Sequence, residues 1–226
     1  MKAGVLVKAV AVASLAVATV SWSPGRAGAE KYFSKTGKVY TWDFAADTLE
    51  HRPANSIALG GTWKVLADSA DTARTATRFL RQAEDDDGVA YHYLRFTKPT
   101  LNDLDVSVRF RIVSGEIDPT VGILFQVDRK GTSGYLVRVS GKSGELIFHY
   151  LLYGKRRDVR TAAIEPIEPL TWHTMSLSRR GSVLRASLDG KERMMVRDER
   201  YSRGTVGLWT ENDTVADFAD LAVTAR

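Results

Sequence analysis

The residues of this sequence best suited to bind a polar ligand are cationic and amide side chains. They alternate with apolar residues along predicted strands and would therefore point away from the core. Arginine presents a planar fork that fits hydroxyl groups or a carboxylate. Two aromatic residues, Tyr153 and Trp209, could stack on the apolar face of a sugar ring. The polar members of the set are Arg109, Arg111, Gln126, Arg138 and His149. If their strands are neighbours, they form one mostly cationic surface; the alternative is a solvated sheet face whose arginines pair with Asp105 and Glu145.

These side chains must be positioned by strands, because apolar and polar residues alternate along the sequence with a period of two. Residues 106–112 alternate between apolar and polar side chains, as do residues 121–127 and 135–139. This alternation is typical of half-buried antiparallel strands. Further short strands are expected at 146–153, 173–177, 184–188 and 206–209, separated by turns that contain glycine.

The spacing of the strands, with no long helical pattern, predicts an all-β protein built as a two-sheet antiparallel β-sandwich or a barrel. Residues 68–83 are compatible with one helical turn or with a strand and a loop. The segment 217–220 is expected to lie in a turn or at the start of a strand. No low-complexity linker divides the chain, so we expect one domain over residues 30–226.

The first 29 residues have the features of a secretory signal peptide. Lys2 precedes a mostly apolar stretch from Val5 to Val20, and Ala27-Gly28-Ala29 is a small-x-small cleavage site. The apolar stretch is shorter than the roughly 20 residues that span a bilayer. We therefore expect a secreted or periplasmic protein, without stable membrane insertion after cleavage.

Charge and cysteine content exclude several classes of function. The chain of 226 residues has a formal net charge of +5, and loss of Lys2, Lys8 and Arg26 with the leader would lower it to +2. That small charge, together with export, argues against nucleic acid as a partner. The absence of cysteine excludes disulfides, a thiol nucleophile and a thiolate metal site.

Several local motifs, in order, resemble the concanavalin A-like lectin/glucanase jelly-roll superfamily, and most closely its 3-keto-disaccharide hydrolase (laminin-G-like) domain family. The matching segments are WDFAADT (42–48), GGTWKV (60–65), VSVRFRIVSGEID (106–118), GILFQVD (122–128), Tyr-x-Val-Arg (135–138), YGKR (153–156) and GLWTENDTVADFADLAV (207–223). The resemblance implies two packed antiparallel sheets, one of them concave, with a shallow groove that binds carbohydrate in many relatives. It does not by itself imply catalysis.

Catalysis would need a pair of titratable groups in a cleft. Glu116-Ile117-Asp118 is similar to part of the Glu-x-Asp-x-x-Glu signature of family 16 glycoside hydrolases, but Val121 stands where the second Glu would be. Gly115 and Pro119 flank the triplet and favour a turn. The weak catalytic candidates are Asp118, Glu145 and His149, and we expect this site only if the three lie close together.

An acidic run, 84–87, could line a loop for structural Ca²⁺, with Asp85 and Asp87 as weak ligand candidates. A hairpin turn with solvated charges explains the run without a metal. We therefore expect no cofactor, with structural Ca²⁺ as the alternative.

These observations favour an exported domain that binds a glycan or glycoconjugate through an Arg-rich sheet face. The predicted ligand-binding residues are Arg109, Arg111, Gln126, Arg138, Tyr153 and Trp209. Two alternatives stay open: a glycoside hydrolase or lyase of the 3-keto-disaccharide hydrolase type, and a cell-envelope adhesion or scaffold domain.

Overall fold

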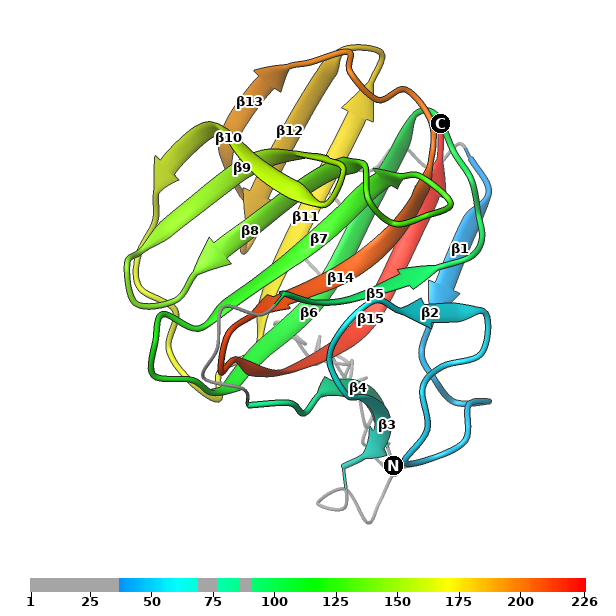
Figure 1. The fold of residues 1–226 in the computed structure, drawn as a ribbon, viewed down its shortest axis with the longest axis vertical. Coiled ribbons are helices and arrows are strands. Elements are labelled where there is room, and N and C mark those ends of the chain that lie inside the picture. The colour runs from blue at the N-terminus through cyan, green and yellow to red at the C-terminus, as the bar shows by residue number, and fades with distance from the viewer. Residues whose placement is uncertain (1–36, 69–76, 86–90) are drawn as a thin grey trace, which may run out of the picture.

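The computed structural model describes residues 37–68, 77–85 and 91–226, which form a sandwich of two antiparallel sheets (Figure 1). The predicted leader, residues 69–76 and Asp87 lie outside the described residues. Within the described ranges, no helix is long and apolar enough to cross a membrane.

The eight-stranded sheet contains the predicted strand at 106–112. Its spatial order is β13 (Lys191–Arg197), β12 (Val183–Leu188), β11 (His173–Arg180), β6 (Leu104–Ser114), β15 (Val215–Ala225), β4 (Arg78–Gln82) and β3 (Trp63–Ala67), with β1 (Val39–Trp42) also paired to β15.

The seven-stranded sheet contains the predicted strands at 121–127 and 135–139. Its spatial order is β10 (Lys155–Ala163), β9 (Glu145–Leu152), β8 (Gly134–Ser140), β7 (Thr120–Val127), β14 (Thr205–Glu211), β5 (Tyr91–Phe96) and β2 (Ser56–Ala58).

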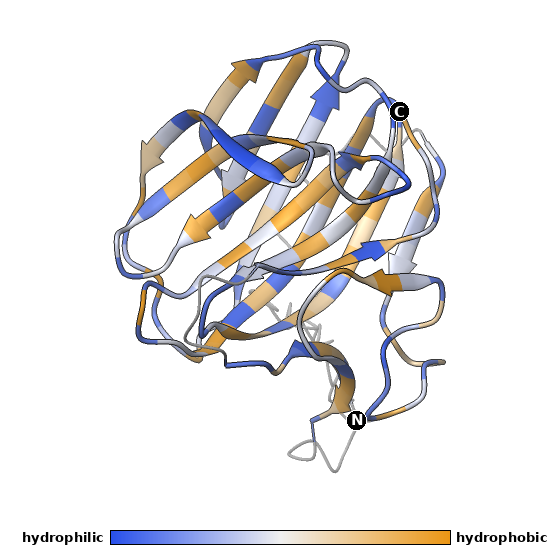
Figure 2. Cartoon of the chain, viewed as in Figure 1, coloured by the Kyte–Doolittle hydropathy of each residue, from blue (hydrophilic) through white to orange (hydrophobic). Residues whose placement is uncertain are grey.

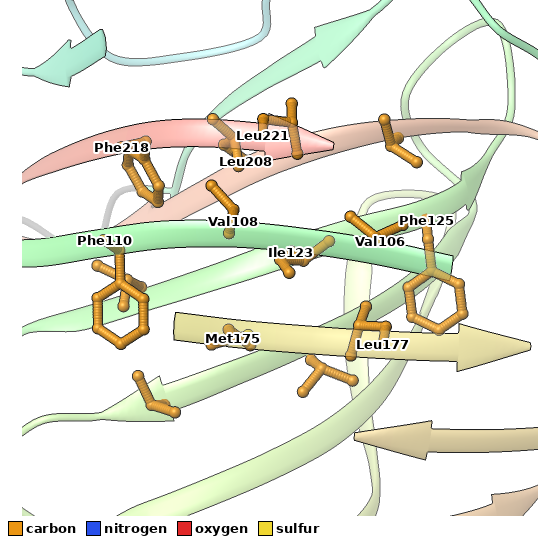
Figure 3. Packing of buried hydrophobic residues seen from close by; sticks show 14 of the residues in the cluster. Val106, Val108, Phe110, Ile123, Phe125, Met175, Leu177, Leu208, Phe218 and Leu221 are labelled. Carbon is orange, nitrogen blue, oxygen red and sulfur yellow. The ribbon is translucent and has the colours of Figure 1, made fainter. Parts of the chain in front are cut away.

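The core lies between the two sheets and follows from the period-two pattern. Val108 and Phe110 of β6 belong to the same buried cluster as Ile123 and Phe125 of β7, and it fills the space between the two sheets (Figure 3). Orange and blue segments alternate along the strands in Figure 2, as expected when one face of each sheet is buried. The predicted all-β sandwich is therefore confirmed.

One part of the strand prediction is wrong. Residues 217–220 lie within β15, where a bulge between Ala219 and Ala222 and a positive φ of 51° at Asp220 interrupt the alternation that marks a strand. For the segment 68–83, the strand alternative is correct at its described end, which forms β4. β10, which follows the turn at Tyr153-Gly154, is not among the expected strands. It is an edge strand that is almost wholly exposed and therefore carries no apolar periodicity.

Candidate functional site

The predicted ligand-binding residues lie on opposite sides of the sandwich. Arg138 on β8 and Trp209 on β14 are on the outer face of the seven-stranded sheet. Arg109 and Arg111 are on β6, in the other sheet, and face outward there. The expectation of one Arg-rich face is thus wrong, because strand parity fixes which side of its own sheet a residue occupies but not which sheet the strand joins.

Two further predicted residues occupy different environments. Gln126 is buried near the end of β7, where its Nε2 donates to the carbonyl oxygen of Asn102 at 2.7 Å. Tyr153 is 83% exposed in the turn between β9 and β10. Gln126 is therefore shielded from a ligand, whereas Tyr153 is accessible.

Arg138 is the centre of a polar network on the outer face of the seven-stranded sheet. Its Nη1 donates to Oγ of Ser140 at 2.6 Å and to Oγ1 of Thr120 at 3.4 Å. Its Nε lies 3.5 Å from a carboxylate oxygen of Glu211. The Arg138 side chain is only 11% exposed, and burial lowers its pKa, with Glu211 acting in the opposite direction.

His149 joins this network as a neutral side chain. The Nε–H of Arg138 donates to Nε2 of His149 at 3.0 Å, and Nδ1 lies 2.8 Å from Oδ1 of Asp158. An acceptor role for Nε2 requires the tautomer in which Nδ1–H donates to Asp158. Burial, and then the charges of Arg138 and Arg156, lower the pKa of His149 to about 3.

Glu211 connects the network to the far edge of the sheet. Its two carboxylate oxygens each accept a hydrogen bond of 2.6 Å from Nη1 of Arg156 on β10. Strands β9, β8 and β7 separate β10 from β14, which corresponds to about 19 Å along the sheet. One arginine can bridge these strands only because the sheet curls and the β9–β10 hairpin folds over its outer face (Figure 1).

An aromatic group lies beside this bridge. The rings of Tyr91 and Tyr93 lie 4.8 and 5.2 Å from the ring of Trp209, and the Arg156 guanidinium lies 5.4 Å above Tyr91. Trp209 is only 1% exposed, so it supports the two tyrosines and cannot itself stack on a ligand. Tyr91, which is partly exposed, is the better candidate for that role.

We call the five charged and polar side chains the Arg138 network: Arg138, His149, Arg156, Asp158 and Glu211. The sequence pattern indicated Arg138 and His149 but not the other three residues or Tyr91. Glu211 has the same strand parity as Trp209, which was a usable signal. The sequence held no signal for Arg156, because its partner Glu211 lies four strands away in the sheet.

The catalytic candidates do not form one acid/base site. Asp118 accepts the backbone N–H groups of Lys142 and Ser143 at 3.0 and 3.2 Å, and Oγ of Ser143 bridges Asp118 and Glu145. This is the bonding of a turn cap. His149 is four residues along β9 from Glu145, about 13 Å away.

His149 is also unsuited to proton transfer near neutral pH. A general acid or base works best when its pKa is close to the operating pH, and the pKa of His149 is about 3.

The metal candidates receive no support from the described residues. Asp85 is exposed, and Asp87 is not described. Among residues 37–68, 77–85 and 91–226, no three His, Asp or Glu side chains are grouped so that they could hold a metal ion.

The outer face of the eight-stranded sheet carries its own polar cluster. The guanidinium groups of Arg109 and Arg111 each lie 4.8 Å from the ring of Trp172. The fully buried carboxylate of Asp217 accepts from Arg111 at 2.7 Å and from Arg81 at 2.6 and 2.9 Å. These contacts account for the two arginines without a ligand.

Comparison with known proteins identifies the fold. No protein-family model matches the chain, and no curated protein matches its sequence. The carbohydrate binding module CBM66 from Bacillus subtilis has a TM-score of 0.63, with 18% identity over 76% of this chain and 96% of that one. The β-glucanase of Bacillus licheniformis has a TM-score of 0.57, with 10% identity over 85% of this chain and 100% of that one.

A third similar structure is the exoplasmic domain of VIP36 in its Ca²⁺-bound form. Its TM-score is 0.54, with 9% identity over 73% of this chain and 83% of that one. At such identities the similarity establishes the fold alone, which is the concanavalin A-like jelly roll that the sequence motifs predicted.

Proposed function

We propose that this protein is an exported glycan-binding domain, and that its ligand lies on the outer face of the seven-stranded sheet above the Arg138 network. The observation that carries the proposal is the pairing of Arg138 and Arg156 with Glu211, which is only 10% exposed. Buried ion pairs contribute little net stability, because desolvation offsets their attraction. A network of this kind on a sheet surface therefore favours a binding role over a purely structural one.

The accessible groups around the network suit a sugar. Tyr91 offers a ring on which a pyranose or furanose can stack. The Arg156 guanidinium and the Asp158 carboxylate, which is 73% exposed, can donate to and accept from neighbouring hydroxyl groups. Because Arg138, Glu211 and His149 already hold one another, little side-chain freedom is lost when a ligand binds.

The similar structures support the same class of ligand. One of them is a carbohydrate binding module, and VIP36 was solved in complex with Man₂ and with Man₃GlcNAc. The predicted leader supports export to a compartment where glycans are accessible. We propose binding without catalysis, because the low pKa of His149 and the turn-capping bonds of Asp118 do not suit acid/base chemistry.

The proposal is tested by titrating the protein with a panel of soluble polysaccharides and oligosaccharides. We expect Arg156→Ala and Asp158→Ala each to weaken binding roughly tenfold, because each removes a charged hydrogen-bonding group. The matched control is Arg185→Ala with Glu192→Ala, an ion pair of 2.7 Å on the other sheet, and it should leave binding unchanged.

Two outcomes would contradict the proposal in different ways. Binding that survives both Arg156→Ala and Asp158→Ala would place the glycan elsewhere on the molecule. No binding to any carbohydrate in the panel would favour the adhesion or scaffold alternative.

A further inference from the structure

The turn between β9 and β10 holds an aromatic residue in a backbone conformation that does not suit it. Tyr153 and Gly154 are the two residues of the turn, with φ values of 51° and 75°. Positive φ at both positions is the pattern of a type I′ turn, which favours Asn, Asp or Gly at its first position. A tyrosine there is strained, since its Cβ crowds the backbone.

Packing does not offset this strain. Tyr153 is 83% exposed, and the space beside its neighbour Gly154 is open, since a Cβ added there would meet nothing within 4 Å. Strained residues that the core does not need are often retained at binding sites. An exposed ring at a fixed turn is also a surface on which a sugar can stack.

Exposed cations lie on this hairpin and on the loop that is hydrogen-bonded to its turn. The backbone N–H of Gly154 donates to the carbonyl oxygen of Thr132 at 2.8 Å, which ties the turn to the β7–β8 loop (Figure 1). That loop contributes Arg129 and Lys130, and the hairpin contributes Lys155; all three are exposed. Within the described part of the chain, no carboxylate pairs with any of the three.

One acidic residue in the loop is already engaged. Asp128 accepts the backbone N–H groups of Thr132 and Ser133 at 2.9 and 3.4 Å, so it shapes the loop. The loop 128–133 and the turn residues 153–155 together carry three cations and one carboxylate, a net charge of +2. We call the four residues Tyr153, Arg129, Lys130 and Lys155 the hairpin corner.

The hairpin corner is continuous with the proposed glycan site. Tyr93, whose ring packs on Trp209 beside the Arg138 network, donates from its hydroxyl group to the carbonyl oxygen of Gly131 in the β7–β8 loop at 3.1 Å. A glycan chain bound at the Arg138 network would therefore extend toward the corner. We propose, on the basis of the proposed function, that the hairpin corner is a subsite for an acidic sugar unit, with its ring on Tyr153 and its carboxylate against the three cations.

The test compares a carboxylated polysaccharide, polygalacturonate, with neutral soluble glycans of similar length. The protein is used as recovered after export, and every variant has the same amino terminus, so the predicted leader cannot explain a difference between them. We expect tighter binding of the acidic polymer, and we expect added salt to weaken that preference, because exposed charges are screened.

Tyr153→Asn separates binding from folding. An Asn-Gly pair is favoured in a type I′ turn, so the melting temperature should stay the same or rise while binding of polygalacturonate weakens roughly 2- to 10-fold. Tyr153→Phe keeps the ring and should keep the affinity.

A charge variant tests the cations in the same assay. Lys130→Gln with Lys155→Gln should abolish the preference for the acidic polymer and leave binding of neutral glycans unchanged. The matched control, Arg185→Gln with Lys191→Gln on β12 and β13 of the other sheet, should keep the preference.

The outcomes distinguish this inference from the proposed function. Neutral glycans that bind normally, with no preference for the acidic polymer or no effect of the corner variants, would overturn the subsite and leave the proposed function intact. The subsite would also be overturned if the protein bound vesicles of an anionic phospholipid as tightly as it binds polygalacturonate. That result would show that the hairpin corner binds a lipid surface. If the unsubstituted protein binds no carbohydrate at all, both the subsite and the proposed function are overturned.

Discussion

At the scale of single residues, the central feature is a histidine that is kept neutral inside a charged network. His149 is fully buried between Arg138, which donates to its Nε2, and Asp158, which accepts from its Nδ1. The Arg138 charge favours the neutral imidazole and orients it. The histidine in turn fixes the arginine that also contacts Glu211.

His149 predicts a specific loss of stability in acid. In the unfolded chain the pKa of His149 returns to about 6.5, and in the folded protein it is about 3. Below pH 6.5 the unfolded state therefore binds a proton that the folded state does not, and this difference favours unfolding. We expect the free energy of unfolding to fall by roughly 1 kcal/mol per pH unit between pH 6.5 and about 3 through this group.

His149→Gln should remove this component of the pH dependence in urea titrations. The control is His51→Gln at an exposed position, which should keep the pH dependence of the unsubstituted protein. Parallel pH profiles for His149→Gln and the unsubstituted protein would show that His149 is protonated equally in both states.

At the scale of elements, a glycine on β7 leaves room for the side chain of Arg138 on the neighbouring strand β8. Gly122 on β7 is paired with Trp209 on one side and Arg138 on the other. A Cβ at Gly122 would lie 2.8 Å from the side chain of Leu136 and 3.0 Å from Cβ of Arg138. The glycine is therefore required by close packing on the outer face.

Gly122→Ala should disturb the site through packing alone. We expect it to lower the free energy of unfolding by about 1–3 kcal/mol, because a methyl group is forced into a filled space. We also expect weaker glycan binding, because Arg138 must shift. Urea denaturation and glycan titration measure the two effects.

Gly181→Ala is the control for this substitution, since a Cβ there would meet nothing within 4 Å. Its positive φ of 57° predicts a conformational cost without any change in binding. A Gly122→Ala variant that binds as the unsubstituted protein does would show that the position of Arg138 is not critical.

At the scale of the whole molecule, the two outer faces are separated by the core of the sandwich. The Arg138 network occupies one face, and the arginines stacked on Trp172 occupy the other. A ligand bound to one face does not touch the other. Substitutions on the eight-stranded sheet should therefore have no direct effect on the proposed site.

Arg109→Ala tests this separation. Arg109 pairs with Asp220 at 3.0 Å, and both side chains are substantially exposed, so the pair contributes at most about 1 kcal/mol to stability. We expect unchanged glycan affinity and nearly unchanged stability, measured by titration and urea denaturation. A large loss of affinity would show that the ligand contacts the eight-stranded sheet.

The amino-acid sequence by itself determined the all-β class and the strands β6, β7, β8, β9, β11, β12 and β14, because strand periodicity and glycine turns are local properties. It gave no signal for the exposed edge strand β10. It identified the strands that carry Arg109 and Arg138 and placed both side chains away from the core. It failed at 217–220, where a bulge interrupts the alternation.

Only the tertiary structure decided which strands share a sheet and which side chains meet. β6 and β8 alternate in the same way, yet they belong to different sheets because pairing depends on contacts between segments far apart in the chain. For the same reason, the pairing of Arg156 with Glu211, 55 residues away, depends on the curl of an entire sheet. No local pattern in the sequence encodes that curl.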